Sequence, residues 1–333
     1  MSSQEAGRAG GIAELDAERR RTRAAYGEGA LIVCDRVVRI YAGDGIEVQA
    51  LQGLDLLVTE GELTAIIGAS GSGKSTLMNI LAGLDAPTAG AVRVDGHDLS
   101  SMTGRERLAY RRRVVGFIWQ QTARNLLPYL TGVQNVLMPM RLGGVRRRDR
   151  ARRAMELLDA LGVAHCAHRV PERMSGGEQQ RTAIATALAN EPRLLLADEP
   201  TGELDTASAG DVFTALQTAN AELGATVLVV THDPAVSARV RRTIAIRDGR
   251  TSTETLRRGP VDASGQAAHV AVEYAVLDRA GRVQLPREMI SRLGMHDRVR
   301  LQERPDHIGV WPDQASPPPG DADPAAAPQP GED

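Results

Sequence analysis

The 333-residue sequence predicts an α/β fold built on a parallel sheet. Three observations support this. Apolar segments of strand length alternate with helical segments, a glycine-rich loop joins one such strand to a helix, and another apolar strand ends in two adjacent carboxylates. Strands that alternate with helices are typical of parallel sheets covered by helices. Such sheets bind ligands at the carboxyl ends of their strands, so functional residues are expected there.

Between residues 30 and 251 the expected elements follow this alternation. In chain order, we expect strands over Leu31–Tyr41, Leu54–Thr59 and Glu62–Ile67, a helix from Lys74 to Gly83, a strand over Val114–Trp119, mostly helical residues 132–190 including a helix over Asp149–Leu161, a strand over Arg193–Ala197, a helix over Ala207–Leu223 and a strand over Thr226–Thr231. The dipeptide Asp248-Gly249 predicts a tight hairpin turn at the end of this region.

Composition changes on both sides of this region. Residues 1–29 are rich in Gly, Ala, Arg and Glu, and we expect a disordered tail there. Residues 252–268 are polar and predict a linker, residues 269–312 predict a small β-rich domain, and the Pro-, Ala- and Asp-rich residues 313–333 predict a second disordered tail.

Bulk properties exclude several classes of protein. The net charge of −2 argues against a chain built mainly to bind nucleic acid. There is no run of 18 apolar residues and no apolar signal-peptide core, so neither a membrane span nor export is expected. The two cysteines, Cys34 and Cys166, lie far apart, which favours a cytoplasmic protein without disulfides. His165, Cys166 and His168 allow a partial metal site, but a free thiol and surface imidazoles are the favoured interpretation, since no fourth ligand has zinc spacing.

The glycine-rich loop matches a phosphate-binding P-loop in both residues and context, because it follows an apolar strand and opens a helix. Its backbone N–H groups and the helix N-terminus favour a polyphosphate. Lys74 is the only lysine among 40 basic residues; its ammonium is expected on the β- and γ-phosphates, and the Ser75 hydroxyl on Mg²⁺. The candidate nucleotide-binding residues here are Gly68, Ala69, Ser70, Gly71, Ser72, Gly73, Lys74, Ser75 and Thr76.

The two carboxylates follow the apolar strand Leu194-Leu-Leu-Ala. Asp198 is a candidate Mg²⁺ ligand, because this ion prefers carboxylate and water oxygens. Glu199 is then free to polarise an attacking water molecule. After a P-loop, this pair predicts nucleotide hydrolysis.

A third motif, Ser175-Gly-Gly-Glu-Gln-Gln-Arg181, precedes an Ala-rich helical segment. With it, residues 31–251 resemble the ABC ATPases, whose signature is usually written LSGGQ; this copy has Met174 for Leu and Glu178 for Gln. The resemblance implies a P-loop cassette with an antiparallel β subdomain and a helical signature subdomain. It further implies that Ser175, Gly176, Gly177 and Glu178 cover the γ-phosphate bound to a second copy, so that a homodimer encloses two ATP molecules with Mg²⁺.

Other family positions occur in the expected order. By resemblance, Gln120 links Mg²⁺ to a transmembrane partner, Asp205 communicates across the dimer, His232 contacts the γ-phosphate and Tyr41 stacks on adenine. Taken alone, His232 and Tyr41 are also compatible with purely structural roles. The resemblance implies a motor that lies on the inner face of the cell membrane through a separate permease.

The segments Leu130–Val136 and Ala197–Asp205 look most like the lipoprotein-releasing, macrolide-efflux and cell-division branch. Two other functions stay open: a soluble ABC ATPase of DNA repair or translation, and an ATP-gated DNA-binding regulator.

The C-terminal segment resembles the AbrB-like swapped-hairpin domains in Gly281-Arg-Val, Leu285-Pro and Leu293-Gly. An unrelated β-rich appendage is the alternative. Residues 269–312 contain more apolar residues than so short a unit can bury alone, which favours a role in dimerisation. The basic residues of the C-terminal segment are balanced by acidic ones, which argues against DNA binding.

Overall fold

The structure is a computed structural model that describes residues 26–43, 46–121, 124–258 and 270–313. It contains two compact units whose boundary falls between Arg282 and Val283. Apart from residues 26–29 and 313, the two expected disordered tails lie outside the described residues.

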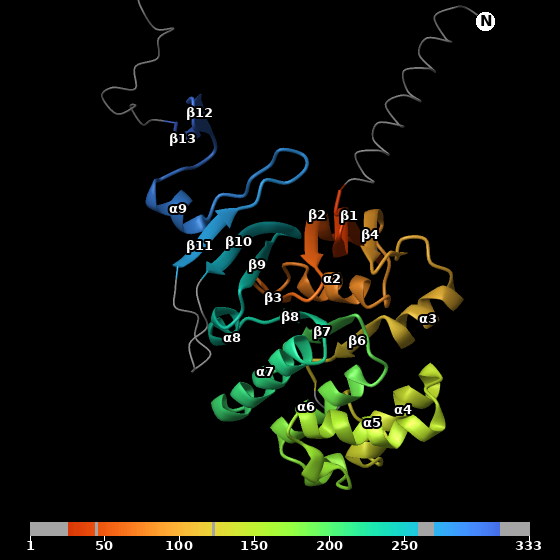
Figure 1. Ribbon diagram of the computed structural model, residues 1–333. Coiled ribbons are helices and arrows are strands. Elements are labelled where there is room, and N and C mark those ends of the chain that lie inside the picture. The colour runs from red at the N-terminus through yellow and green to blue at the C-terminus, as the bar shows by residue number, and fades with distance from the viewer. Residues whose placement is uncertain (1–25, 44–45, 122–123, 259–269, 314–333) are drawn as a thin grey trace, which may run out of the picture. The chain divides into compact units, whose positions relative to one another are not determined.

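A seven-stranded sheet forms the centre of the first unit and confirms the predicted α/β class (Figure 1). Its strand order is β11-β10-β9-β3-β8-β7-β6, and the five strands from β9 to β6 are parallel. In chain order the strands are β3 (Leu63–Ile67), β6 (Val115–Ile118), β7 (Leu194–Asp198), β8 (Thr226–Val230), β9 (Arg242–Arg247), β10 (Arg250–Arg258) and β11 (Val270–Ala275).

A second, antiparallel sheet has the order β2-β1-β4-β5. It consists of β1 (Ala30–Gly43), β2 (Ile46–Thr59), β4 (Ala89–Val94) and β5 (His97–Asp98). The second strand begins eight residues before the predicted Leu54, because its first half pairs with the exposed end of β1 rather than with the core. No helix or strand was predicted for residues 89–98.

Helices follow the strands, and several begin at caps that the sequence specifies locally. Thr103, Thr131 and Ser175 each form a capping box with a Glu or Gln three residues later. The α-helices of this unit are α2 (Lys74–Leu81), α3 (Gly104–Arg113), α4 (Gly132–Gly143), α5 (Arg147–Ala160), α6 (Gly176–Leu188), α7 (Thr206–Ala221) and α8 (Pro234–Ala238), with short 3-10 helices η2 (Ala164–Cys166) and η3 (Pro171–Arg173).

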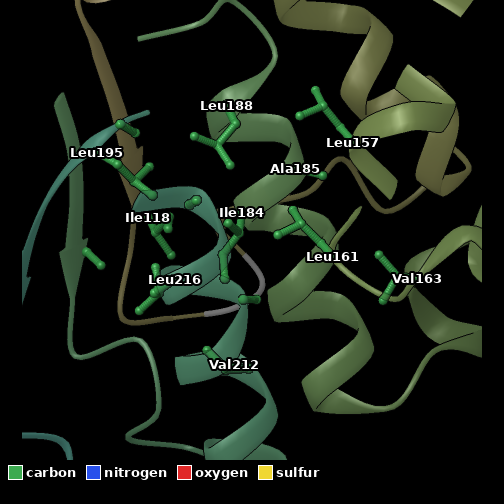
Figure 2. Close-up of a cluster of buried hydrophobic side chains, with 14 of the residues drawn as sticks. Ile118, Leu157, Leu161, Val163, Ile184, Ala185, Leu188, Leu195, Val212 and Leu216 are labelled. Carbon is green, nitrogen blue, oxygen red and sulfur yellow. The ribbon is translucent and has the colours of Figure 1, made fainter. Parts of the chain in front are cut away.

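Two buried cores lie on opposite faces of the central sheet, because successive side chains of a strand point to opposite faces. Leu195 and Ala197 join the core formed with α5, α6 and α7, which Figure 2 shows. Leu194 and Leu196 join the core formed with α2 and the antiparallel sheet. The helices α4, α5 and α6 also pack on one another, and α6 packs on α7 as well (Figure 1).

The strands at the end of the first unit differ from the predicted organisation. The expected linker over residues 252–268 is wrong for residues 252–258, which belong to β10. The strand β11 pairs with β10 from Thr253↔Ala275 to Arg258↔Val270, so residues 270–275 belong to the seven-stranded sheet. The threonines of this segment are β-branched and suit a strand, although its polar character suggested a linker. Residues 259–268 of the expected linker lie outside the described residues.

The second unit contains α9 (Arg287–Arg292) and an antiparallel pair, β12 (Val299–Glu303) and β13 (Ile308–Pro312). Among its described residues only Met295 is a buried hydrophobic side chain. Large apolar side chains remain exposed at Val283, Met289, Leu293, Val299, Leu301 and Ile308. A two-stranded hairpin is at best marginally stable in water. The AbrB-like identity of this segment stays a prediction.

In the part of the chain that the structure describes, none of the helices combines the length and the apolar character needed to cross a bilayer.

Candidate functional site

A groove of about 550 Å³ lies at the carboxyl edge of the parallel sheet. The edge collects residues from four strands: Gly68 follows β3, Gln120 follows β6, Asp198 ends β7 and His232 follows β8. The groove is lined by Tyr41, Val48, Gln49, Ala50, Gly68, Ser70, Gly71, Gly73, Lys74, Ser75, Thr76, Gln120, Asp198, Glu199, Val230 and His232. The fold therefore brings most of the predicted site residues together.

The P-loop requires glycine at two close approaches of the backbone. A Cβ at Gly68 would lie 2.3 Å from the Ile246 carbonyl oxygen, and one at Gly73 would lie 2.5 Å from the Ala50 carbonyl oxygen. Gly73 also has a φ of 102°, in the left-handed region that favours glycine. These positions let the chain turn from β3 into α2 with its backbone N–H groups available at the helix N-terminus.

The P-loop contains the cationic side chain of Lys74 and the hydroxyl of Ser72, which is available for a further hydrogen bond. Lys74 as a whole is 9% exposed, and its ammonium donates hydrogen bonds to the carbonyl oxygens of Gly68 (2.7 Å) and Ala69 (2.9 Å). Among the described residues, the buried Ser72 hydroxyl has no hydrogen-bond partner. Ser75 is exposed at the first turn of α2, and Thr76 is half-buried beside it. A polyphosphate group fits this set of donors.

The two carboxylates lie directly beside the P-loop. Burial raises the pKa of Asp198 and the Glu199 carboxylate raises it further, while the Lys74 ammonium lowers it. A divalent cation would relieve the repulsion between these carboxylates, so Asp198, with the hydroxyl of Ser75 and the amide of Gln120, suits Mg²⁺. Glu199 has a φ of 47°, and its backbone N–H donates to the Val230 carbonyl oxygen at 2.9 Å.

His232 is held against Glu199. Its Nδ1 lies 2.9 Å from Glu199 Oε1, and its backbone N–H donates to Oε2 at 3.3 Å. The imidazole is 73% exposed, whereas the carboxylate is only 12% exposed. The hydrogen bond to Glu199 and the charge of that carboxylate raise the pKa of His232, although burial acts in the opposite direction. The contact fixes the direction in which the Glu199 carboxylate points.

One wall of the groove is formed by a part of β2 for which no strand was predicted. Val48, Gln49 and Ala50 line the groove, but the expected strand began only at Leu54. This stretch carries no motif, and the position of Ala50 follows from the close approach of its carbonyl to Gly73. Only the alternation of apolar and polar residues from Ile46 onward signalled a strand.

The signature residues lie elsewhere, at the N-terminus of α6; none of the described residues that line the groove comes from this helix. Ser175 caps the helix, Gly176 and Gly177 form its first turn, and the Glu178 carboxylate accepts from the Ser175 backbone N–H at 2.7 Å. That N–H and the contact with His165 lower the pKa of Glu178 to about 2. The helix N-terminus is thus capped, with Ser175 and Gly176 exposed.

The cluster of possible metal ligands around Cys166 differs from the expected one. The structure brings together His165, Cys166 and Glu178, rather than His168. The Arg169 guanidinium lies 3.9 Å from the Cys166 sulfur and 3.7 Å from Glu178, so a cation already occupies this position. Cys166 is a buried free thiol, as is Cys34. The cluster is best interpreted as support for the cap of α6.

Asp205 is the N-cap of α7. Its Oδ1 accepts from the backbone N–H groups of Ala207 and Ser208, both at 3.0 Å. The structure therefore gives the side chain a local role, and its expected role in communication across a dimer stays a prediction.

The chain is similar to known proteins in sequence and in fold. A family model described as ABC transporter matches residues 51–202. The Macrolide export ATP-binding/permease protein MacB of Syntrophobacter fumaroxidans is 42% identical over 261 residues, which cover 76% of this chain and 36% of that protein. The chain thus spans little more than a third of the length of this relative.

Two solved structures are similar over their full length. A dimeric structure of MJ0796, a bacterial ABC transporter cassette, is 39% identical with a TM-score of 0.62. A dimeric post-hydrolysis state of the same cassette, bound to ADP and Pi, is 38% identical with a TM-score of 0.62. Each covers 69% of this chain and is itself covered completely.

Proposed function

Since the chain belongs to the ABC transporter family and carries its ATPase domain, we propose that two copies bind ATP between them and drive a separate membrane permease. One observation carries this proposal. A single groove at the carboxyl edge of the sheet holds the only lysine of the sequence, the two carboxylates and the histidine that contacts Glu199.

The phosphate chain of the nucleotide is assigned to the P-loop. The N-terminus of α2 and the loop N–H groups attract the anion, and the Lys74 ammonium lies within the same loop. The ammonium would exchange its contacts with the carbonyl oxygens of Gly68 and Ala69 for contacts with phosphate oxygens. Ser75, Gln120 and Asp198 would hold Mg²⁺, which when bound neutralises charge on the phosphates.

Glu199 is assigned the role of general base. Its carboxylate is mostly buried, lies on the groove and is oriented by two contacts from His232. A positioned carboxylate accepts the proton of the attacking water as the water's oxygen bonds to the terminal phosphorus. His232, which is exposed, is free to exchange its contact with Glu199 for one with the terminal phosphate.

A second copy would complete the site. The signature residues Ser175, Gly176, Gly177 and Glu178 form an anion-binding helix N-terminus away from this chain's own groove. In a head-to-tail dimer they would cover the phosphates bound to the other copy. The description of the similar cassettes as dimeric supports this arrangement.

The permease is proposed to be a separate chain that holds this protein on the inner face of the cell membrane. The macrolide-export relative is named as both ATP-binding and permease protein, and the present chain matches 36% of its length. This similarity favours the branch that includes lipoprotein release, macrolide efflux and cell division.

Two substitutions test the catalytic assignment. Lys74→Ala is expected to lose ATP binding, because it removes the cation from the phosphate site. Glu199→Gln is expected to keep binding and lose hydrolysis, and so to accumulate an ATP-bound dimer on size-exclusion chromatography. Arg152→Ala, on the exposed face of α5, is the matched control. Turnover at the wild-type rate in Glu199→Gln would contradict the role given to Glu199.

The partner is tested by fractionation. Expressed alone, the protein is expected to remain in the supernatant. Expressed with its permease, it should sediment with membranes. Complete membrane binding in the absence of any permease would contradict the proposal.

A further inference from the structure

Tyr41 is held in place by two charged side chains at the rim of the groove. Tyr41 lines the groove and is 39% exposed. The Arg39 guanidinium lies over the ring, with its central carbon 4.4 Å from the ring centroid. The Tyr41 hydroxyl donates a hydrogen bond to Asp85 Oδ2 at 2.9 Å. The ring is therefore fixed both over its surface and at its tip.

Arg39 and Asp85 also bind each other. Arg39 Nε donates to Asp85 Oδ2 and Nη2 lies by Oδ1, both at 2.9 Å, which makes the pair bidentate. The side chains are only 24% and 21% exposed. Bidentate pairing fixes the plane of a guanidinium as well as its position. Burial raises the pKa of Asp85, but the Ala86 N–H, the Tyr41 hydroxyl and Arg39 outweigh it and lower that pKa overall.

The backbone that carries Asp85 is tied to both sides of the groove. Asp85 follows α2, the helix that begins at the P-loop, and its N–H donates to the carbonyl oxygen of Asn79 within that helix at 3.2 Å. Three residues later, the Thr88 N–H donates to the Val38 carbonyl oxygen of β1 at 2.8 Å. Its hydroxyl accepts from the Ile40 N–H at 3.0 Å. The position of Tyr41 is thus coupled to the helix that holds the phosphates.

We propose that Arg39 and Asp85 are positioning residues that fix the ring of Tyr41 for stacking on the base of the bound nucleotide. This inference rests on the proposed nucleotide-binding function. An aromatic ring held in its binding orientation loses little further freedom when a base stacks on it. Arg39 covers the ring from one side, so that the base takes the side that faces the groove.

Affinities for two ligands, one with a base and one without, distinguish a role in positioning Tyr41 from a general structural role. The full-length protein is titrated by calorimetry with ATP and with inorganic tripolyphosphate, both with Mg²⁺. Asp85→Ala and Arg39→Ala are each expected to weaken ATP binding about three- to tenfold, the range of partly exposed ion-pair and cation–π contacts. Tripolyphosphate carries no base, so its affinity is expected to stay at the wild-type value. Asp85→Asn keeps an acceptor for the Tyr41 hydroxyl and should lose less than Asp85→Ala.

A double-mutant cycle then tests whether Asp85 acts through Tyr41. Tyr41→Ala removes the ring, and adding Asp85→Ala to it is expected to cause no further loss of ATP affinity. Additive losses, or an equal loss of tripolyphosphate affinity, would show that Asp85 supports the loop rather than the ring. Unchanged ATP affinity in Asp85→Ala would also refute the proposal.

The remaining controls distinguish failure of the positioning role of Asp85 from failure of the nucleotide site itself. Arg152→Ala should bind both ligands normally, and circular dichroism verifies the fold of each variant. If Asp85→Ala does not fold, Asp85→Asn and Tyr41→Phe replace it, and both should lose ATP affinity while retaining tripolyphosphate. Lys74→Ala should lose both ligands; if it retained them, the nucleotide site itself would be refuted, whatever the result at Asp85.

Discussion

Removal of the Arg279 side chain is expected to destabilise the first unit by about 2–3 kcal/mol. Arg279 Nη1 lies 2.8 Å from Asp35 Oδ1, a carboxylate whose side chain is only 3% exposed. The same guanidinium lies over the Tyr26 ring, 4.5 Å from its centroid. Arg279→Ala removes both contacts but leaves the backbone N–H of residue 279, which donates to Asp55 Oδ2 at 3.1 Å.

The magnitude follows from what the substitution leaves behind. Loss of one partner of a buried ion pair costs about 3–5 kcal/mol, because the remaining charge is buried without its counterion. Here the cost is smaller, since Arg36 Nε still donates to Asp35 at 3.1 Å and Arg279 is itself 26% exposed. The lost cation–π contact adds about 0.5–1 kcal/mol.

Urea unfolding followed by Trp119 fluorescence measures this change. The sequence contains two tryptophans, so a Trp311→Phe background leaves only the reporter in the first unit. Arg152→Ala, which removes an exposed pair with Glu156, serves as the control and should leave the midpoint unchanged. An Arg279→Ala midpoint equal to that of the control would refute the reasoning, because the Arg279 side chain would then contribute nothing to the stability of the unit.

Three further predictions concern the candidate site. By NMR, the pKa of His232 should lie above the ordinary value of about 6.5, and Glu199→Gln should lower it. Because the pKa of His232 is raised in the folded protein, the stabilisation from its pair with Glu199 is present at low pH and is lost as the pH rises through that pKa. Glu178, with a pKa lowered to about 2 from 4.5, contributes stability that is present above pH 4.5 and lost as pH falls towards 2. Glu178→Ala should therefore lower the thermal midpoint at neutral pH, and an equal loss near pH 2 would contradict this assignment. Gly68→Ala should lose ATP binding in a folded protein, because its Cβ would lie 2.3 Å from the Ile246 carbonyl oxygen; normal ATP affinity would show that the loop adjusts.

Residues at the ends of the parallel strands could be predicted because their signals are local. A glycine-rich loop between an apolar strand and a helix, or two carboxylates after an apolar strand, places its side chains at the carboxyl edge wherever the strand lies in the sheet. The turn at Asp248-Gly249 is local in the same sense. Both residues have positive φ, as a two-residue hairpin turn of type I′ requires, and Arg247 pairs with Arg250.

The antiparallel strands and α3 were harder to predict. The strands pair with segments that are distant in the sequence, and few side chains of α3 are buried. Residues 89–113 were assigned no element, although they form β4, β5 and α3. In α3 only Tyr110 is buried, so apolar periodicity is almost absent. The capping box from Thr103 to Glu106 was its one local signal. The polar strand β10 is stabilised by pairing with β9 and β11 on either side, which the local sequence does not indicate.

The hairpin at Gly249 connects these distant strands to the nucleotide site. The Gly249 N–H donates to the Ser72 carbonyl oxygen of the P-loop at 3.0 Å. The Gly249 carbonyl oxygen accepts from the Gln52 N–H of β2 at 2.9 Å. A Cβ at this position would lie 2.7 Å from the Ala50 carbonyl oxygen, so only glycine allows both contacts without displacement. The turn could be predicted from two residues, but its contact with the P-loop depends on the packing of β2 against β9 and β10. The strand β11 pairs with β10, and the backbone N–H of Arg279 donates to Asp55 of β2. The segment that follows the expected cassette boundary at residue 251 therefore contacts two of the strands on which the position of this turn depends.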